Sequence, residues 1–230
     1  MENPWVLVET TFPHIPLPPL SRRQAIRTKR LLIRPMEEDD LQAYHELRLQ
    51  PEAMASSRQG RPDRNVEETR SALNNFLPPD CDKTFLYGVF LPSTGELIGE
   101  GGIHTLESSS CGWPEIGYRF KTEVWGQGYA TEFLKALLRA WWDLPRRRTR
   151  LRVHSSSIQR GRDVEAVEQI HANTDLQNIG SQKVLAKLGF ILFSEYTEPD
   201  TQEHSVGEPL ALKGYRLALP CNYARDNNAN

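Results

Sequence analysis

The chain has 230 residues, of which 38% are hydrophobic, and this size suits one large globular domain with a substantial core. Its 28 Lys and Arg residues nearly balance 30 Asp and Glu residues, so the net charge of -2 provides no overall positive field for a nucleic acid or an anionic membrane. Three cysteines stand far apart without the spacing of metal ligands, which argues against a disulfide framework and a structural zinc site.

The beginning of the chain, residues 1–28, is predicted to be an extended arm. A proline-rich stretch from Pro13 to Pro19 disfavours a helix there. The amino terminus lacks the charged and then apolar pattern of a secretory signal, and no later stretch holds the ~18–20 apolar residues of a membrane-spanning helix. We therefore expect a cytoplasmic protein that is not attached to a membrane.

One domain is predicted over residues 29–220, and its first half is rich in strands. A strand over 31–33 precedes a helix over 37–49, whose acidic first turn suits the positive end of the helix dipole. A second helix over 66–77 stops at two prolines. Three strands follow without helices between them, which predicts an antiparallel meander; they cover 85–90, 96–104 and 114–120.

The second half of the domain alternates helices and strands. The clearest helix covers 130–142, where large apolar residues recur at three- and four-residue spacing. An arginine-rich segment over 145–165 is longer than a helix-to-strand connection requires, and we interpret it as an insertion at the domain edge. The remaining predicted elements are a strand over 167–172, a helix over 178–188, and strands over 190–195 and 212–219. The order of elements indicates the α/β (α+β) class, and a polar tail over 221–230 ends the chain.

Two glycines separated by one residue, Gly126 and Gly128, connect the meander to the clearest helix. Because glycine leaves backbone N–H groups unshielded, and because the positive end of a helix favours an anion, this loop predicts a phosphate cradle. A dinucleotide fingerprint would need glycine in place of Thr131, and a Walker loop would need lysine after Gly117, where Tyr118 stands. The remaining alternative is a helix start that uses glycine for turn geometry alone.

Three motifs in this half of the chain carry a family resemblance. They are Glu115-Ile116-Gly117-Tyr118, then Trp125-Gly126-Gln127-Gly128-Tyr129-Ala130-Thr131-Glu132, then Asn178-Ile179-Gly180-Ser181 running into Val184-Leu185-Ala186-Lys187-Leu188-Gly189-Phe190. With the opening Arg30-Leu31-Leu32-Ile33-Arg34-Pro35, the chain resembles the GNAT acetyltransferase superfamily over about residues 28–220. The RimJ/RimL-like branch of ribosomal-protein and small-amine N-acetyltransferases is the most similar. Glu123 departs from the usual Gln or Arg of the superfamily, a change frequent in that branch.

The resemblance implies the GNAT fold, a mixed and mostly antiparallel sheet of about six or seven strands with about four flanking helices. The sheet would be splayed between the strands at 114–120 and 167–172, where acetyl-CoA would enter. Pyrophosphate would lie on the glycine loop, and the pantetheine arm would pair with the strand edge around Tyr118–Lys121. Asn178 would either fix that arm or act as an ordinary N-cap. The implied cofactor-binding residues are Tyr118, Phe120, Lys121, Trp125, Gly126, Gln127, Gly128, Tyr129, Ala130, Thr131, Asn178 and Ser181.

Transfer of acetyl from a thioester to an amine needs a proton acceptor for the amine, a polarised carbonyl and a proton donor for the thiolate. Glu115 stands where histone-acetylating relatives carry their base and is the predicted base, with Glu100 and His104 as alternatives. A salt-bridged strand carboxylate is the other interpretation of Glu115. A backbone N–H near Phe120 would polarise the carbonyl. Ser181 would protonate the thiolate, or would serve only as a helix-cap residue.

The resemblance and the motifs together predict an N-acetyltransferase that acts directly on a primary amine of a protein or peptide N-terminus or of a small molecule. The alternative is a catalytically inactive acyl-CoA-binding or regulatory module with the same fold. We expect a monomer or a homodimer, no nucleic-acid partner and no metal, since the histidines show no ligand spacing. Acceptor specificity is expected in the loops 56–65 and 105–113 and in the hairpin 196–209.

Overall fold

The structure is a computed structural model that describes residues 4–158, 165–221 and 223. Its main feature is a sheet of eight strands, which in the described residues are ordered β2 (Ile26–Arg27), β3 (Leu32–Arg34), β4 (Phe85–Phe90), β5 (Leu97–Thr105), β6 (Glu115–Phe120), β8 (Gln169–Asp175), β10 (Pro209–Ala218) and β9 (Ile191–Pro199). The pairing of β6 with β8 is parallel, and the other described pairings are antiparallel. The mixed, mostly antiparallel sheet is therefore confirmed, with eight strands in place of the six or seven expected.

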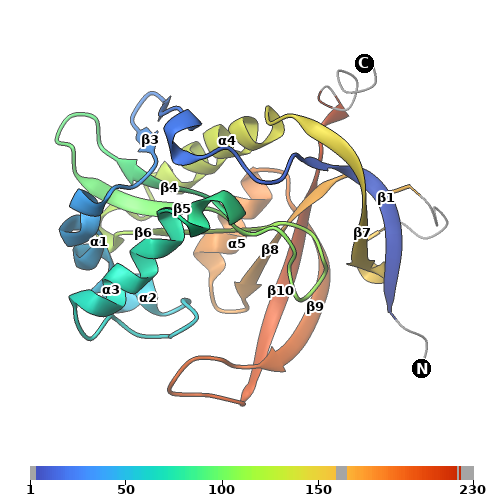
Figure 1. The fold of residues 1–230 in the computed structure, drawn as a ribbon. Coiled ribbons are helices and arrows are strands. Elements are labelled where there is room, and N and C mark those ends of the chain that lie inside the picture. Colours follow the sequence, from blue (N-terminus) through green and yellow to red (C-terminus); the bar gives the residue numbers. More distant parts are fainter. Residues whose placement is uncertain (1–3, 159–164, 222, 224–230) are drawn as a thin grey trace.

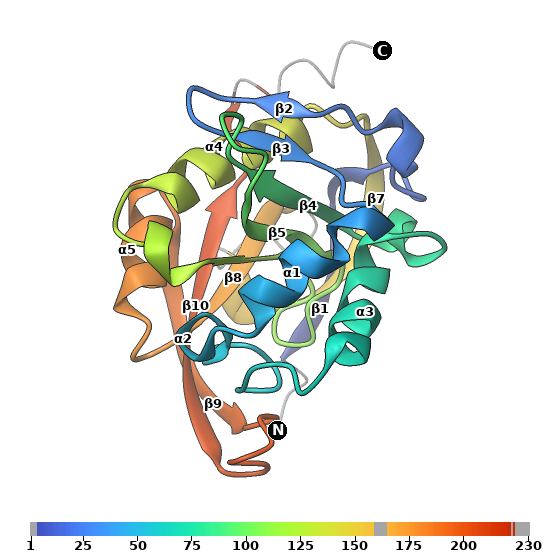
Figure 2. The same ribbon diagram turned by 90° about the vertical axis from the view of Figure 1, so that its left-hand side faces the viewer.

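Helices cover both faces of this sheet (Figure 2). The described helices are α1 (Leu41–Arg48), α2 (Pro51–Met54), α3 (Val66–Leu73), α4 (Tyr129–Trp142) and α5 (Ile179–Lys187). Phe85 and Tyr87 of β4 pack in one core with α4 and α5, whereas Leu86 and Phe90 pack in a second core with α1 and α3. Because successive strand residues point to opposite faces, the two helix groups lie on opposite sides of β4. No helix in these described residues is long and apolar enough to cross a membrane.

The chain before residue 28 contains a strand that the sequence did not reveal. β1 (Trp5–Pro13) pairs antiparallel along its whole length with β7 (Arg146–His154), which is the first part of the arginine-rich segment. Figure 1 shows the two strands side by side, apart from the large sheet. Val8 and Val153 form the inner face of this small sheet and pack on Trp113. The predicted arm and the predicted insertion are therefore partners in one structural unit.

The outer face of the small sheet carries the exposed arginines, several of which have acidic partners. Arg148 forms an ion pair with Glu165, and Arg150 forms one with Glu9 at 3.1 Å. This arrangement is typical of a solvated edge. Residues 159–164 of the predicted insertion lie outside the described residues, as do residues 222 and 224–230 of the predicted tail.

The large sheet opens between β6 and β8, as the resemblance to the GNAT superfamily implies. In the described residues these strands share one register position, at which Glu115 lies opposite His171. The His171 N–H also donates to the Pro114 carbonyl at 2.8 Å. Beyond this point β8 continues along β10, and no strand in the described parts of the chain pairs with the open side of β6 from Gly117 to Phe120. The opening places an exposed strand edge next to the loop that leads into α4.

Candidate active site

The loop before α4 has the conformation that a phosphate cradle needs. Gly126 and Gly128 have φ angles of 72° and 83°, a left-handed region that L side chains disfavour. Apart from its two chain neighbours, no described residue has a heavy atom within 4 Å of the place where a Cβ on Gly126 would stand, and Gly128 is the N-cap of α4. Trp125 fastens the loop to the end of β6, since its Nε1 donates to the Phe120 carbonyl at 2.8 Å. Open space at a helix N-terminus fits the pyrophosphate of coenzyme A.

An arginine that was not among the predicted binding residues lies against this loop. Arg30 donates from Nη1 to the Gln127 carbonyl at 2.9 Å and from Nε to Glu132 at 2.7 Å. Its guanidinium lies 4.2 Å from the centre of the Tyr129 ring, and its Nη2 is 3.6 Å from the position of a Cβ on Gly128. Arg30 therefore brings a positive charge to the loop. The sequence showed it only as part of the opening motif, because its neighbours lie about a hundred residues further along the chain.

The exposed edge of β6 includes Tyr118 and Phe120 but does not extend to Lys121. The Lys121 N–H donates to the Ile98 carbonyl of β5 at 2.9 Å. Because alternate N–H groups along a strand point to opposite sides, those of Tyr118 and Phe120 face the opening. The Lys121 ammonium pairs with Glu96 at 3.0 Å. The N–H and the ammonium of Lys121 thus have partners within the protein, and its contact with the cofactor stays a prediction.

Ser181 at the start of α5 is paired with a tyrosine from β6. The hydroxyls of Ser181 and Tyr118 lie 2.8 Å apart. Burial raises the pKa of Tyr118 to about 12, although the bond to Ser181 acts in the opposite direction, so the phenol is protonated at neutral pH. The sequence of α5 contains no tyrosine. The fold shows that β6 brings Tyr118 to the start of this helix.

Asn178 is the N-cap of α5. Its Oδ1 accepts a hydrogen bond from the Ser181 N–H at 2.9 Å, and its Nδ2 donates to Ser56 at 3.3 Å. The capping role that the sequence left as an alternative is therefore present. Asn178 also lines the same cleft as Ser181 and Tyr118, so capping places its side chain at the candidate site.

Glu115 is the centre of a polar cluster that spans three elements. Its Oε1 lies 3.5 Å from His104 Nε2 on β5, and its Oε2 lies 3.8 Å from His171 Nδ1 on β8. Ser108 also donates to Oε2 at 2.8 Å. Burial opposes a charge on Glu115, but the two histidines outweigh it and hold the pKa of Glu115 well below its usual range. The carboxylate is therefore ionised.

His171 is a functional candidate that sequence reasoning missed. Its side chain is 1% exposed, and no hydrogen-bond partner among the described residues reaches either ring nitrogen. Burial alone would lower the pKa of His171, yet Cys111 and Glu115 raise it to about 9. The ring is thus a buried cation beside Glu115 at neutral pH. Nothing in the local sequence pattern distinguishes it from an ordinary buried strand residue.

The two alternative bases differ in their surroundings. Glu100 is held by Arg119 at 3.1 Å in an ion pair of two largely buried side chains. His104 is 45% exposed and occupies space left by Gly117, where a Cβ would lie 3.0 Å from its ring. The structure therefore brings Glu115 and His104 together and ties Glu100 to Arg119.

One cleft of about 790 Å³ is lined by His104, Glu115, Tyr118, Asn178 and Ser181. Glu115 and Tyr118 are on opposite faces of β6 by strand alternation, so the cleft passes through the opening of the sheet. Its lining is acidic, with six carboxylates (Glu100, Glu107, Glu115, Asp175, Glu198, Asp200) against three guanidinium groups (Arg48, Arg58, Arg119). In the described part of the chain, no group of three His, Cys, Asp or Glu side chains is arranged to hold a metal ion.

Several solved structures share this fold. The acetyltransferase (GNAT family) from Bacillus anthracis is 21% identical, with a TM-score of 0.62 over 85% of this chain and 99% of that chain. An acetyl transferase from Salmonella typhimurium, which modifies the N-terminal serine of the 50S ribosomal subunit protein L7/L12, is 20% identical. Its TM-score is 0.63 over 86% of this chain and 100% of that chain.

A third similar structure contains the expected cofactor. RimL, the ribosomal L7/L12 alpha-N-protein acetyltransferase, in complex with coenzyme A, is 19% identical, with a TM-score of 0.63 over 85% of this chain and 98% of that chain. No curated protein matches the sequence significantly. The family model of the acetyltransferase (GNAT) domain matches residues 30–191. The chain therefore belongs to the GNAT family of acetyltransferases.

Proposed function

We propose that this protein transfers an acetyl group from acetyl-CoA directly to a primary amine. The observation that carries this proposal is that one cleft holds two polar pairs, Glu115 with His104 and Tyr118 with Ser181. When bound, acetyl-CoA supplies the acetyl thioester. The Gly126–Gly128 loop and Arg30 would hold its pyrophosphate, and the free N–H groups of β6 would hold its pantetheine arm.

Proton removal from the amine is assigned to Glu115 and His104 acting together. An amine arrives mostly as an ammonium ion, which the ionised Glu115 attracts. Because the pKa of Glu115 is held low, this carboxylate is a weak proton acceptor by itself. His104 lies 3.5 Å away and is open to the cleft, so its imidazole takes the proton while Glu115 stabilises the resulting imidazolium.

The other two requirements are met on the cofactor side of the opening. The Phe120 N–H faces the opening and can donate to a carbonyl oxygen as negative charge develops on it. Ser181 holds a proton that the departing thiolate can take. Tyr118 is protonated and lies 2.8 Å from Ser181, so its hydroxyl can supply Ser181 in turn.

The acceptor is a primary amine that is positively charged before it reacts. The excess of carboxylates over guanidinium groups in the cleft favours such a ligand. A peptide N-terminus is supported by the Salmonella typhimurium structure, whose protein modifies an N-terminal serine. The loop around Ser57 and the hairpin residue Gln202, whose Nε2 donates to the Ser57 carbonyl at 3.0 Å, close one side of the cleft.

Two measurements test the proposal. Titration calorimetry with acetyl-CoA should show saturable binding, and a thiol reagent should detect free coenzyme A when an amine panel is added. The panel should contain peptides with free N-termini and small mono- and diamines. Binding without thiol release on any amine would favour a non-catalytic acyl-CoA-binding module. No binding of acetyl-CoA would contradict both functions.

A further inference from the structure

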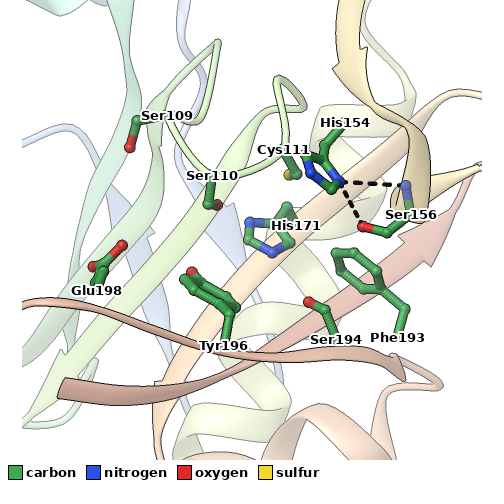
Figure 3. Close-up of a pocket in the computed structure, with 10 residues that line it drawn as sticks. All are labelled: Ser109, Ser110, Cys111, His154, Ser156, His171, Phe193, Ser194, Tyr196 and Glu198. Carbon is green, nitrogen blue, oxygen red and sulfur yellow. Dashed lines mark hydrogen bonds between the residues drawn. The ribbon is translucent and has the colours of Figure 1, made fainter. Parts of the chain in front are cut away.

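A smaller cavity of about 270 Å³, whose lining residues are drawn in Figure 3, adjoins the large cleft. The two cavities share Ser109, Ser110 and Glu198, so they meet at these residues. Rings of Phe193 and Tyr196 form part of the wall of the smaller one. Ligand pockets for whole small molecules hold ~300–1,000 Å³. The smaller cavity therefore suits one arm of a ligand whose reacting end lies in the large cleft.

Glu198 at this junction is a carboxylate without a partner. In the described residues no hydrogen bond or ion pair reaches it, although its side chain is half-buried. Other carboxylates of the cleft have close polar partners: Arg119 for Glu100, Ser108 and His104 for Glu115, and Ser205 for Asp200. Glu107, which also has no side-chain partner among the described residues, is exposed to solvent. Glu198 thus differs from its neighbours.

The electrostatic surroundings of Glu198 favour a cation. Burial raises the pKa of Glu198, and the nearby charges of Glu115 and Asp200 raise it further, while Arg58 lowers it without forming an ion pair. His171, a buried cation that lines the smaller cavity together with Glu198, is matched to Glu115. A positive group beside Glu198 would therefore relieve a repulsion that Arg58 compensates only in part.

The reacting amine alone cannot fill this role throughout the reaction. It must lose its proton before it attacks, and it then carries no charge for Glu198 to bind. A second positive group on the same acceptor keeps its charge during the transfer. The aromatic walls of the smaller cavity suit the apolar chain that joins two such groups, and they also favour a cation through their ring faces.

We propose that Glu198 binds a second positive charge on the acceptor, so that the preferred substrates carry an ammonium or guanidinium group in addition to the amine that is acetylated. This inference rests on the proposed acetyl transfer and specifies its acceptor. Free diamines and polyamines share this chemistry with peptides that have a basic side chain near the N-terminus. The experiment below distinguishes these two sources.

The test compares acceptors that differ in one charge. 1,4-Diaminobutane is paired with 1-aminobutane, and a Ser-Lys peptide is paired with the same peptide acetylated on the lysine Nζ. We expect the kcat/KM of the dicationic member to be about tenfold higher in at least one pair. The pair that shows the preference identifies the source as a free polyamine or a basic peptide.

The variant Glu198→Gln should abolish that preference. The KM of the dicationic acceptor should rise about tenfold, while its kcat, the KM of acetyl-CoA and the activity on the monocation stay close to wild type. Glu195→Gln is the matched control, because it removes the same charge from the opposite face of the same strand, where Glu195 is exposed. It should behave as wild type.

Failure of this inference can be separated from failure of the proposed function. Equal kcat/KM values within both pairs, or a preference that survives in Glu198→Gln, would overturn the inference and leave acetyl transfer intact. If no amine is acetylated, the proposed function fails. In that case, calorimetric titration of 1,4-diaminobutane and the Ser-Lys peptide into the protein saturated with coenzyme A tests the Glu198 site by itself. Binding to wild type that is lost in Glu198→Gln supports the site. No binding to wild type overturns it.

Discussion

Glu115 and His171 are the register pair that joins β6 to β8 in the described structure, and their side chains face each other at 3.8 Å. The same two residues therefore close the sheet at the point where it begins to open and hold opposite charges at the candidate site. This position limits how far either side chain can move, because each is attached to a strand of the sheet. We infer that His171 positions Glu115.

Loss of the Glu115 carboxylate should mainly affect the chemical step. In Glu115→Gln, His104 loses the charge that stabilises its imidazolium, and we expect kcat to fall about 100-fold while acetyl-CoA binding is retained. Steady-state kinetics and calorimetry measure the two effects. Glu107→Gln is the control, because Glu107 also lines the cleft but is exposed and has no side-chain partner among the described residues. An unchanged kcat in Glu115→Gln would remove Glu115 from the mechanism.

The pH profile should report on His171. The positive charge of His171 helps to hold the pKa of Glu115 low, so in His171→Gln that pKa should rise toward its ordinary value. The active form needs Glu115 ionised and His104 without its extra proton, and loss of the positive charge at His171 favours proton uptake by this pair. The acid side of the kcat/KM profile should therefore move to higher pH in the variant. A profile that is lower at every pH but not displaced would indicate a purely structural role.

Stability should change with pH through the same histidine. The pKa of His171 in the folded protein is about 9, above its ordinary value of 6.5. A raised pKa stabilises the fold fully below pH 6.5, and this contribution is lost as the pH rises through 9. Chemical denaturation should show that wild type loses on the order of 3 kcal/mol over this range relative to His171→Gln. Parallel curves for the two proteins would contradict the charge on His171.

Tyr118 and Ser181 should behave as one unit. Tyr118→Phe and Ser181→Ala each break the 2.8 Å contact, and we expect each to lower kcat about tenfold. The double variant should be no slower than the slower single variant, because both changes remove the same proton path. Fully additive losses would show that the hydroxyls act separately. Wild-type turnover in Ser181→Ala would exclude it as the proton donor.

Arg30 should contribute to cofactor binding and not to acceptor choice. Arg30→Gln removes the positive charge beside Gly128, and we expect the Kd of acetyl-CoA to rise about tenfold with the acceptor KM unchanged. Arg30→Lys should restore part of the loss. Arg27→Gln, an exposed change on β2, controls for net charge. Equal Kd values for Arg30→Gln and Arg27→Gln would assign Arg30 to holding the loop alone.

Elements whose pattern lies within one short stretch of the chain could be predicted from the sequence. The apolar spacing that defines α4 is set by helix periodicity, and the three strands of the meander lie next to one another in the chain. The predicted helices over 37–49 and 66–77 are shorter in the structure. The first turn of the helix predicted over 37–49 is a 3-10 turn, Glu38–Asp40. The last turn of the helix predicted over 66–77 is also a 3-10 turn, Asn74–Phe76. Such end effects are not visible in apolar spacing.

Most of the missed features depend on residues that are distant in the sequence. β1 finds its partner more than a hundred residues later. β2 is an exception, because it has two residues, too few for a periodic pattern. The contacts of His171 with Glu115 and of Tyr118 with Ser181 are set by strand register and helix placement. The lack of a partner at Glu198 is a property of the assembled cleft, and no spacing of residues reports it.

The pairing of β1 with β7 has a consequence for how the protein is made. During synthesis Trp5 is made before the large sheet, but His154, its register partner, follows only after five of the eight described strands of that sheet have been translated. The N-terminal segment must therefore wait unpaired, and its docking is a late event in folding. A chain shortened to begin after Pro13 would leave β7 with an open edge beside the buried Val153, which invites association between molecules.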